Sequence, residues 1–541
     1  MFHRLKTFFK LSLIGVATAS VAIFASTYTG NANFASMQVW TEPSMKQVRL
    51  DTPPGANTDI DLVAARGEVE SFQIAIRATG NNAGSIRNIY VSDLVNENNN
   101  AIAKDKITLY REHYVNVPKA SPKDFNINVS QGTGWYPDAL IPFKDPTTKQ
   151  DLVGAELDAI PFTPKANRNQ PFWVDISVPR GAAPGRYQGT YTVESDRGIF
   201  TGQISLKVWD FTLPVSPSLK SAFYFEDQGY PQLHKELLKH KMMPKRVAPD
   251  RAREMIDHYG LNVLRLPYWS GANVRTCKMD EPPSVETMRQ KIAEYPKDLT
   301  LYVFSADEIE KCENLEQPLK RWAKVVRAAG AKHLLVTIPF KEWQDDGTGT
   351  GRSLADIWVV KPAMYETHSQ DINQAIAKGD EVWFYTGYSN PYSPKWLLDY
   401  PPIDFRIPQG FISQSMGIQG VLFWKTDLWH HKDPWTKITA AHFGNFRDRV
   451  FPGDGMLLYP GAKVGIDGVA PSMRMKWIRD GIEDYEYIEI LKKLGEGQWA
   501  LNVSRNIGAD WKNWTKDPRK LESARAQLGS RIEAIMQERK R

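Results

Sequence analysis

The sequence predicts an N-terminal antiparallel β-sandwich, followed by a (β/α)8 barrel and a C-terminal helical tail. Apolar and polar residues alternate from about residue 39 to 214, which is typical of antiparallel strands. Further along, short apolar segments alternate with helical segments, as in parallel α/β domains. Pro214 and Pro217 lie where the pattern changes, and 541 residues are enough for more than one domain.

The N-terminal region, residues 1–35, is predicted to be a signal peptide or an N-terminal anchor. It has a basic head, an apolar stretch of about fifteen small or aliphatic residues and a polar exit, which is the pattern of an export signal. The apolar stretch is shorter than the ~20 residues that span a bilayer. We therefore expect a secreted or periplasmic protein, with an uncleaved anchor as the alternative.

Residues 36–215 are predicted to form the β-sandwich domain. The segment 70–78 places Phe72, Ile74 and Ile76 on one face and polar residues on the other. Many short strands without helices between them favour a sandwich. Further strands are expected at 172–179, 186–195 and 201–214.

Residues 216–495 are predicted to form the barrel, and residues 496–541 the helical tail, which we expect to dock on it. Seven or eight strand–helix units fit a (β/α)8 barrel with right-handed crossovers. A doubly wound sheet is the alternative, but no glycine-rich phosphate loop opens a helix here. The predicted barrel strands are 221–226, 261–269, 299–308, 333–339, 356–362, 381–388 and 419–426.

Acidic and aromatic residues follow the predicted barrel strands. The active sites of such barrels lie at the carboxyl ends of the strands. Flat rings stack on the apolar face of a sugar, while acids take its hydroxyl groups, so the mixture favours a carbohydrate ligand. The residues at or near these ends include Glu226, Asp307, Glu308, Tyr385, Trp424, Trp429 and Tyr459.

The adjacent acids Asp307 and Glu308 allow two interpretations. Ser305 and Glu308 match a capping box, which would place the acids in the first turn of a helix. Alternatively, the pair is catalytic. Neighbouring Cα atoms are only ~3.8 Å apart, which is awkward for attack from opposite faces of a sugar. The spacing suits a reaction in which the sugar's own 2-acetamido oxygen attacks the anomeric carbon.

Several segments resemble the DUF4091 group, which is related to glycoside hydrolase family 123. The resemblance rests on "VFSADE", "GVLFWKTDLW", "GDGMLLYPG" and "PSMRMKWIRDGIEDYEYIEIL", and it covers nearly everything after the signal. It implies a β-sandwich joined to a catalytic barrel and the activity of an exo-acting β-N-acetylgalactosaminidase with substrate assistance. A proline commonly follows the acid pair in that group, whereas Ile309 stands here.

The resemblance also implies roles for single residues. Asp307 would orient the acetamido group, and Glu308 would be the general acid and then the base. Tyr385 would reach the acetamido carbonyl, while Trp424 and Trp429 would wall the sugar subsite. The remaining predicted substrate-binding or supporting residues are Glu226, Arg406, Tyr459 and Arg474. By contrast, Arg479, Asp480, Glu483 and Asp484 are expected to form a structural ion-pair network.

Charge, histidine and cysteine patterns bear on nucleic-acid binding, metal binding and disulfide formation. The net charge of +6 is spread along the chain without a basic block, which argues against nucleic-acid binding. Adjacent His430 and His431 do not suit one tetrahedral metal site, and we expect no metal and no cofactor. Cys277 and Cys312 form either a disulfide or two buried thiols.

Three functions remain open from the sequence. The first is an exported glycoside hydrolase for 2-acetamido sugars, acting through Asp307 and Glu308. The second is a hydrolase or lyase for another extracellular polysaccharide. The third is a non-catalytic carbohydrate-binding protein of the cell envelope. In each case the expected partner is an oligo- or polysaccharide.

Overall fold

The computed structural model describes most of the chain after the predicted signal, which itself lies outside the described residues. None of the helices in the described part is long and apolar enough to cross a membrane. The described residues are 37–79, 84–123, 128–226, 232–309, 311–336, 345–386, 390–429, 433–438, 440–441 and 449–540.

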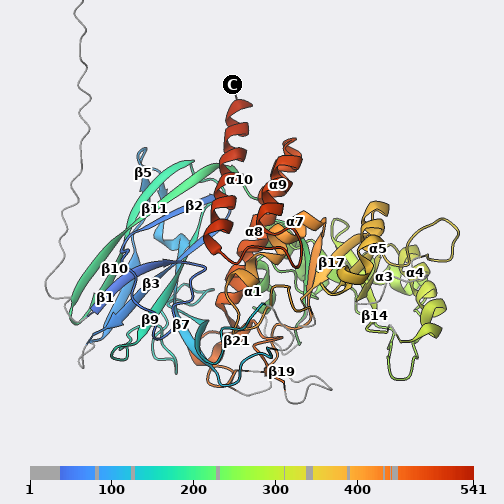
Figure 1. Cartoon of the computed structure of the whole chain (residues 1–541), viewed down its shortest axis with the longest axis horizontal. Coiled ribbons are helices and arrows are strands. Elements are labelled where there is room, and N and C mark those ends of the chain that lie inside the picture. Colours follow the sequence, from blue (N-terminus) through green and yellow to red (C-terminus); the bar gives the residue numbers. More distant parts are fainter. Residues whose placement is uncertain are drawn as a thin grey trace, which may run out of the picture.

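Two β-sheets form the N-terminal half of the molecule (Figure 1). In the first sheet, all neighbouring strands are antiparallel, whereas the second contains one parallel pair, β2 with β11. The first sheet has the order β1 (Met37–Pro43), β3 (Val69–Ala78), β9 (Asn169–Ser177), β7 (Ile107–Val117) and β8 (Gly134–Pro142). The second has the order β2 (Ile60–Arg66), β11 (Gly198–Thr212), β10 (Gly185–Ser195), β5 (Leu94–Asn96) and β6 (Ala101–Ile102), with β4 (Ile86–Val91) beside β10.

The two sheets enclose one apolar core. Phe72, Ile74 and Ile76 of β3 point into it, as their spacing predicts, and meet Leu206 and Val208 of β11. However, β3 and β9 are buried on both faces, because their second face is covered by a C-terminal helix. This second contact explains why the alternation along β9 is imperfect in the sequence.

Glu112 on β7 is an unpaired carboxyl group in this half of the molecule. It is fully buried, and neither of its carboxyl oxygens has a hydrogen-bond partner within the described part of the chain. Burial raises the pKa of the Glu112 carboxyl well above its usual value. The folded protein therefore holds Glu112 protonated at a pH at which the unfolded chain ionises it.

We expect Glu112→Met to stabilise the protein, and more so at higher pH. Above the ordinary carboxyl pKa, ionisation in the unfolded state costs the wild type about 1.4 kcal/mol of stability per pH unit until the folded carboxyl also ionises. The variant has no carboxyl group at this position, so its stability does not decrease with pH for this reason. Thermal melting of both proteins between pH 5 and 8 checks the prediction, and a difference in Tm that does not change with pH would contradict it.

The second half contains a parallel barrel sheet. Its strands overlap the seven predicted segments. Strands β16 and β18 are buried at every residue, as strands covered on both faces are. The sheet order is β12 (Lys220–Phe223), β18 (Gly420–Phe423), β17 (Glu381–Tyr385), β16 (Ile357–Val360), β15 (Lys332–Val336), β14 (Thr300–Asp307) and β13 (Val263–Arg265). The associated helices are α1 (Leu233–Lys239), α2 (Pro249–Tyr259), α3 (Val285–Ala293), α4 (Glu316–Ala329), α5 (Met364–Lys378), α6 (Ile403–Arg406) and α7 (Ser413–Met416).

The barrel is nearly closed, with seven strands in the described residues rather than eight. A short segment around Pro244 fills the gap between β12 and β13. Phe223 N donates to Met243 O at 2.8 Å, Lys245 N donates to Phe223 O at 3.2 Å, and Arg265 N donates to Lys245 O at 3.1 Å. Because proline has no N–H to donate, the segment forms only a single bridge, between Pro244 and Phe223, and does not become an eighth strand.

The C-terminal helices lie between the N-terminal sheets and the barrel (Figure 1). Helix α8 (Met473–Lys493) is buried on nearly every side, so it is a central element and not a surface helix. Helix α10 (Pro518–Glu538) packs on β11 and α8, where Gly529 meets the Trp209 ring and Glu533 pairs with Lys207. The last helix therefore contacts the second sheet as well as helices of the barrel half, where Glu522 pairs with Arg406 of α6. The remaining elements are α9 (Gly497–Ile507), β19 (Ala440–Ala441), β20 (Phe451–Pro452), β21 (Leu458–Pro460) and β22 (Val469–Pro471).

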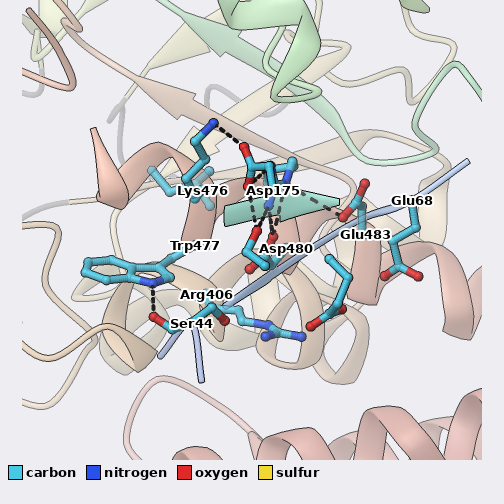
Figure 2. A network of polar contacts seen from close by, with 12 residues as sticks. Ser44, Glu68, Asp175, Arg406, Lys476, Trp477, Asp480 and Glu483 are labelled. Atoms are coloured by element: carbon cyan, nitrogen blue, oxygen red, sulfur yellow. Dashed lines mark hydrogen bonds and ion pairs between the residues drawn. The ribbon is translucent and has the colours of Figure 1, made fainter. Parts of the chain in front are cut away.

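A buried ion-pair network joins α8 to the first sheet (Figure 2). Asp175 of β9 contacts Lys476 Nζ at 2.7 Å and Arg479 Nη1 at 3.4 Å. Asp175 also accepts hydrogen bonds from Ser71 Oγ and Trp173 Nε1. Although burial opposes it, the two cations hold the pKa of the Asp175 carboxyl below its usual range. The expected structural network is present, since Arg479 pairs with Asp480 and Glu483, and Asp484 with Arg406.

Candidate active site

The acid pair lies at the carboxyl end of β14. Asp307 is the last residue of the strand, and Glu308 N donates to Val336 O of β15 at 3.4 Å. Glu308 has a φ of +50°, a left-handed conformation that is costly for a residue with a side chain and is concentrated at functional sites. The capping-box interpretation is wrong, because the chain stays in strand through Asp307 and α4 begins only at Glu316.

A β-bulge precedes the acid pair. Phe304 pairs with Leu334 but Ala306 pairs with Leu335, so Ser305 is the extra residue. Ser305 Oγ lies 2.6 Å from His333 Nε2, and His333 Nδ1 lies 2.9 Å from Leu354 O. A carbonyl only accepts, so Nδ1 carries the proton and Nε2 accepts from the Ser305 hydroxyl. Burial lowers the pKa of His333 to about 4, which keeps the ring neutral.

Ser305→Ala is expected to destabilise the protein and to lower kcat. The change leaves His333 Nε2 as a buried acceptor without a donor, which costs about 1–3 kcal/mol. Because bulges re-aim the residues that follow them, kcat should fall more than KM rises. Urea unfolding and steady-state kinetics check both effects. Ser284→Ala, which removes an N-cap of α3, is the control: it should lose stability with kcat unchanged. An unchanged kcat in Ser305→Ala would contradict the positioning role.

Lys361 joins Glu308 to Tyr385. It follows β16 directly, and its Nζ lies 2.6 Å from Glu308 Oε1 and 5.9 Å from the centre of the Tyr385 ring. The Glu308 side chain is 57% exposed, so a ligand can reach it. The strand ends therefore bring Glu308 and Tyr385 into one region, as predicted. Sequence reasoning missed Lys361, although its position near the carboxyl end of the predicted strand 356–362 could have identified it.

Asp307 faces an aromatic and cationic neighbourhood. Tyr224 is half-buried, and its pKa is raised by desolvation and further by the charge of Asp307. The Tyr224 hydroxyl lies 3.4 Å from that of Tyr302. The Arg265 guanidinium lies 4.7 Å from the centre of the Phe304 ring and 5.5 Å from that of Tyr224. Arg265 ends β13, so these side chains come from three neighbouring positions of the barrel.

Glu226 and Lys425 meet on the other side of the strand ends. Their side chains form an ion pair that connects the residues after β12 and β18. Glu226 N donates to both carboxylate oxygens of Asp427 at 3.0 Å. Burial raises the pKa of Asp427 to about 6 despite this hydrogen bond. The predicted ligand Glu226 is thus 59% exposed and partly engaged by Lys425.

The two predicted tryptophans are fixed by the loop that precedes β21. Trp424 Nε1 donates to Asp454 Oδ1 at 3.1 Å, and Trp429 Nε1 donates to Leu458 O at 2.8 Å. Gly455 has a φ of +70°, and a Cβ there would come within 2.5 Å of the Trp424 ring. Both rings are half-buried. The loop therefore sets the orientation of Trp424, and Trp429 is held by a backbone carbonyl.

Three predicted site residues lie elsewhere, inside the molecule. Arg406 pairs with Asp484 of α8 and Glu522 of α10, and its side chain is 3% exposed. Arg474 and Tyr459 both bind Asp138 of β8, where Arg474 is fully buried. Their polar atoms join the barrel half to the sheets and helices. This placement gives them a supporting role and no direct contact with a substrate.

The remaining predicted features lie at the edges of the site. Cys277 and Cys312 are joined in a disulfide, which connects the segment after β13 to the segment after β14. Within the described part of the chain, no three His, Cys, Asp or Glu residues are grouped as a metal site; His430 and His431 lie outside it. A groove of about 780 Å³ between α9 and α10 contains none of the predicted site residues.

Comparisons with known proteins agree with this architecture. A family model described as the glycoside hydrolase 123 catalytic domain matches residues 271–491, and one described as the glycoside hydrolase 123 N-terminal domain matches residues 40–195. Together they match more than two thirds of the chain. No curated protein matches it.

A solved structure shows a similar fold. A family 123 glycoside hydrolase from Clostridium perfringens, solved to study glycolipid glycan hydrolysis, is 13% identical, with a TM-score of 0.61 over 93% of this chain and 98% of its own. A β-glucuronidase from Parabacteroides merdae is 9% identical, with a TM-score of 0.25 over 66% of this chain and 44% of its own, which is too low to indicate the same fold.

Proposed function

Because this chain is a glycoside hydrolase of the family 123 type, we propose that it cleaves β-glycosides of 2-acetamido sugars, as a β-N-acetylgalactosaminidase does. The observation that carries the proposal is the backbone at the end of β14, where Asp307 and Glu308 are neighbours and Glu308 is held in a left-handed conformation. Two carboxyl groups on neighbouring residues suit a reaction whose attacking oxygen belongs to the substrate.

In the proposed first step, the acetamido oxygen attacks the anomeric carbon while the bond to the leaving oxygen breaks. Asp307 accepts a hydrogen bond from the acetamido N–H and stabilises the positive charge of the cyclic intermediate. Glu308 gives its proton to the leaving oxygen. Lys361 Nζ lies 2.6 Å from Glu308 Oε1, so this contact must open before Glu308 can reach the leaving oxygen.

In the second step, Glu308 takes a proton from water as the water attacks the anomeric carbon. The bond between that carbon and the acetamido oxygen breaks, and the free sugar forms with the anomeric configuration of the substrate. Tyr385, beside Lys361, is the proposed partner of the acetamido carbonyl, and Trp424 the proposed wall of the subsite. We also propose that the enzyme acts on glycans outside the cytoplasm, on the basis of its N-terminal 35 residues.

The proposal is tested with pairs of aryl β-glycosides that differ only at carbon 2, acetamido against hydroxyl. Only the acetamido member should be cleaved, and a thiazoline analogue of the cyclic intermediate should inhibit. Glycolipid glycans that end in a 2-acetamido sugar form a second panel, chosen from the similar enzyme. Equal cleavage of both members of a pair, with no thiazoline inhibition, would overturn the mechanism and favour another polysaccharide as the substrate.

A further inference from the structure

Two basic residues, Lys245 and Arg265, lie side by side at the carboxyl ends of the barrel strands. Arg265 ends β13, and Lys245 ends the short segment that bridges β12 and β13, with 3.1 Å between Arg265 N and Lys245 O. The next strand after β13 is β14, which ends with Asp307. The backbone therefore places both residues on the side of the site next to the acid pair.

Both side chains lie against aromatic rings and lack an acidic partner. Lys245 Nζ is 5.2 Å from the centre of the Phe225 ring, and the Arg265 guanidinium is 4.7 Å from that of Phe304. Both residues are half-buried. Within the described part of the chain, neither residue forms an ion pair with a carboxylate within 4 Å. Most other half-buried cations of the barrel do form such a pair, for example Lys361 and Lys425.

The arrangement is electrostatically unfavourable without a ligand. Burial, and then the charges of Arg246, Arg265 and Lys425, lower the pKa of Lys245 to about 8, while Asp427 acts in the opposite direction. Two carboxylates on this side are already engaged, since Glu226 pairs with Lys425 and buried Asp427 accepts from Glu226 N. The third, Asp307, binds the acetamido group in the proposed function. Partly buried cations without an acidic partner cost folding free energy, and a bound anion would reduce that cost.

We propose that Lys245 and Arg265 bind an anionic substituent of the glycan, a sulfate ester or the carboxylate of an adjoining acidic sugar. This inference rests on the proposed function, because the 2-acetamido sugar at Asp307 brings the anion within reach. A guanidinium fork and an ammonium group complement sulfate or carboxylate oxygens. The rings of Phe225, Tyr224 and Phe304 lie beside these cations and provide an apolar border that strengthens the attraction.

The experiment compares three substrates that share one 2-acetamido sugar. They are the neutral aryl glycoside, the same glycoside with a sulfate ester on the sugar, and an oligosaccharide in which a uronic acid adjoins the sugar. We expect kcat/KM of the wild type to be about tenfold or more higher for one anionic substrate than for the neutral one, the worth of one charge-assisted hydrogen bond. The anionic substrate that shows the preference identifies the group. That preference should shrink from low to physiological ionic strength, since salt screens exposed charges.

Lys245→Gln and Arg265→Gln should each lower the ratio of anionic to neutral kcat/KM by about tenfold. Lys324→Gln, on the exposed face of α4, should leave the ratio unchanged. A wild type with no preference for either anionic substrate, or variants with an unchanged ratio, would overturn the inference. An equal loss of kcat/KM on neutral and anionic substrates would also overturn the inference. It would mean that Lys245 and Arg265 support Asp307 and do not bind the anion. If no 2-acetamido glycoside is cleaved, the proposed function fails as well; neutral cleavage without preference overturns this inference alone.

Discussion

Replacing Glu308 by Gln should lower kcat by about a thousandfold on a 2-acetamido glycoside with an alkyl leaving group, within the 10²–10⁴ range of general acid catalysis. An alkoxide leaves slowly without a proton, and glutamine has no carboxyl proton to give. A nitrophenolate leaves readily as an anion, so with that leaving group the rate of the first step should fall much less in Glu308→Gln. KM should change little, because the amide keeps the shape of the side chain.

Two comparisons make the Glu308→Gln result specific. Asp307→Asn should slow both leaving groups alike, because Asp307 acts on the acetamido group and not on the leaving oxygen. Glu316→Gln, at the start of α4, is the matched control and should retain full activity. Initial rates with the alkyl and nitrophenyl glycosides distinguish these cases. A Glu308→Gln enzyme that cleaves the alkyl glycoside at the wild-type rate would remove Glu308 from the mechanism.

Asp175→Ala should lower the free energy of unfolding by about 3–5 kcal/mol, which is the range for breaking a buried ion pair. The change leaves Lys476 and Arg479 in the interior, where their side chains are 3% and 2% exposed. Arg479 retains Asp480 as a partner, but Asp175 is the one acid that Lys476 pairs with in the described residues. Ser71 Oγ and Trp173 Nε1 lose their acceptor as well.

The stability loss should appear in urea unfolding as a lower midpoint. Asp298→Ala provides the control, since its ion pair with Arg253 is about half exposed on both sides and should contribute almost nothing. Asp175→Asn separates charge from shape, and we expect most of the loss to remain in that variant. Equal midpoints for Asp175→Ala and the wild type would show that the network does not hold the two halves together.

Much of the barrel could be predicted from the sequence, because its strands are short, apolar and separated by helices. Segments such as 356–362 and 419–426 contain the strands β16 and β18. The bridge at Pro244 could not be predicted, since a single backbone pairing has no periodicity. The place of α8 was also missed, because its charged residues suggest a solvent-exposed surface.

The candidate site was predicted in part for the same reason. Strand ends are easy to find, so Asp307, Glu308 and Tyr385 could be grouped before the fold was known. The capping-box pattern of Ser305 and Glu308 was misleading because local sequence does not show that His333 binds the Ser305 hydroxyl. Arg406 and Arg474 match family motifs, but only the structure shows that their partners lie on distant elements.

The charges on α8 limit how this enzyme could be recombined with its relatives. Lys476 and Arg474 belong by sequence to the barrel half, yet their acidic partners, Asp175 and Asp138, lie on β9 and β8. A chimera whose exchanged N-terminal 215 residues lacked acids at the positions of Asp138 and Asp175 would bury these cations without their partners. Hybrids that fold should therefore take the two N-terminal sheets and helix α8 from the same parent protein.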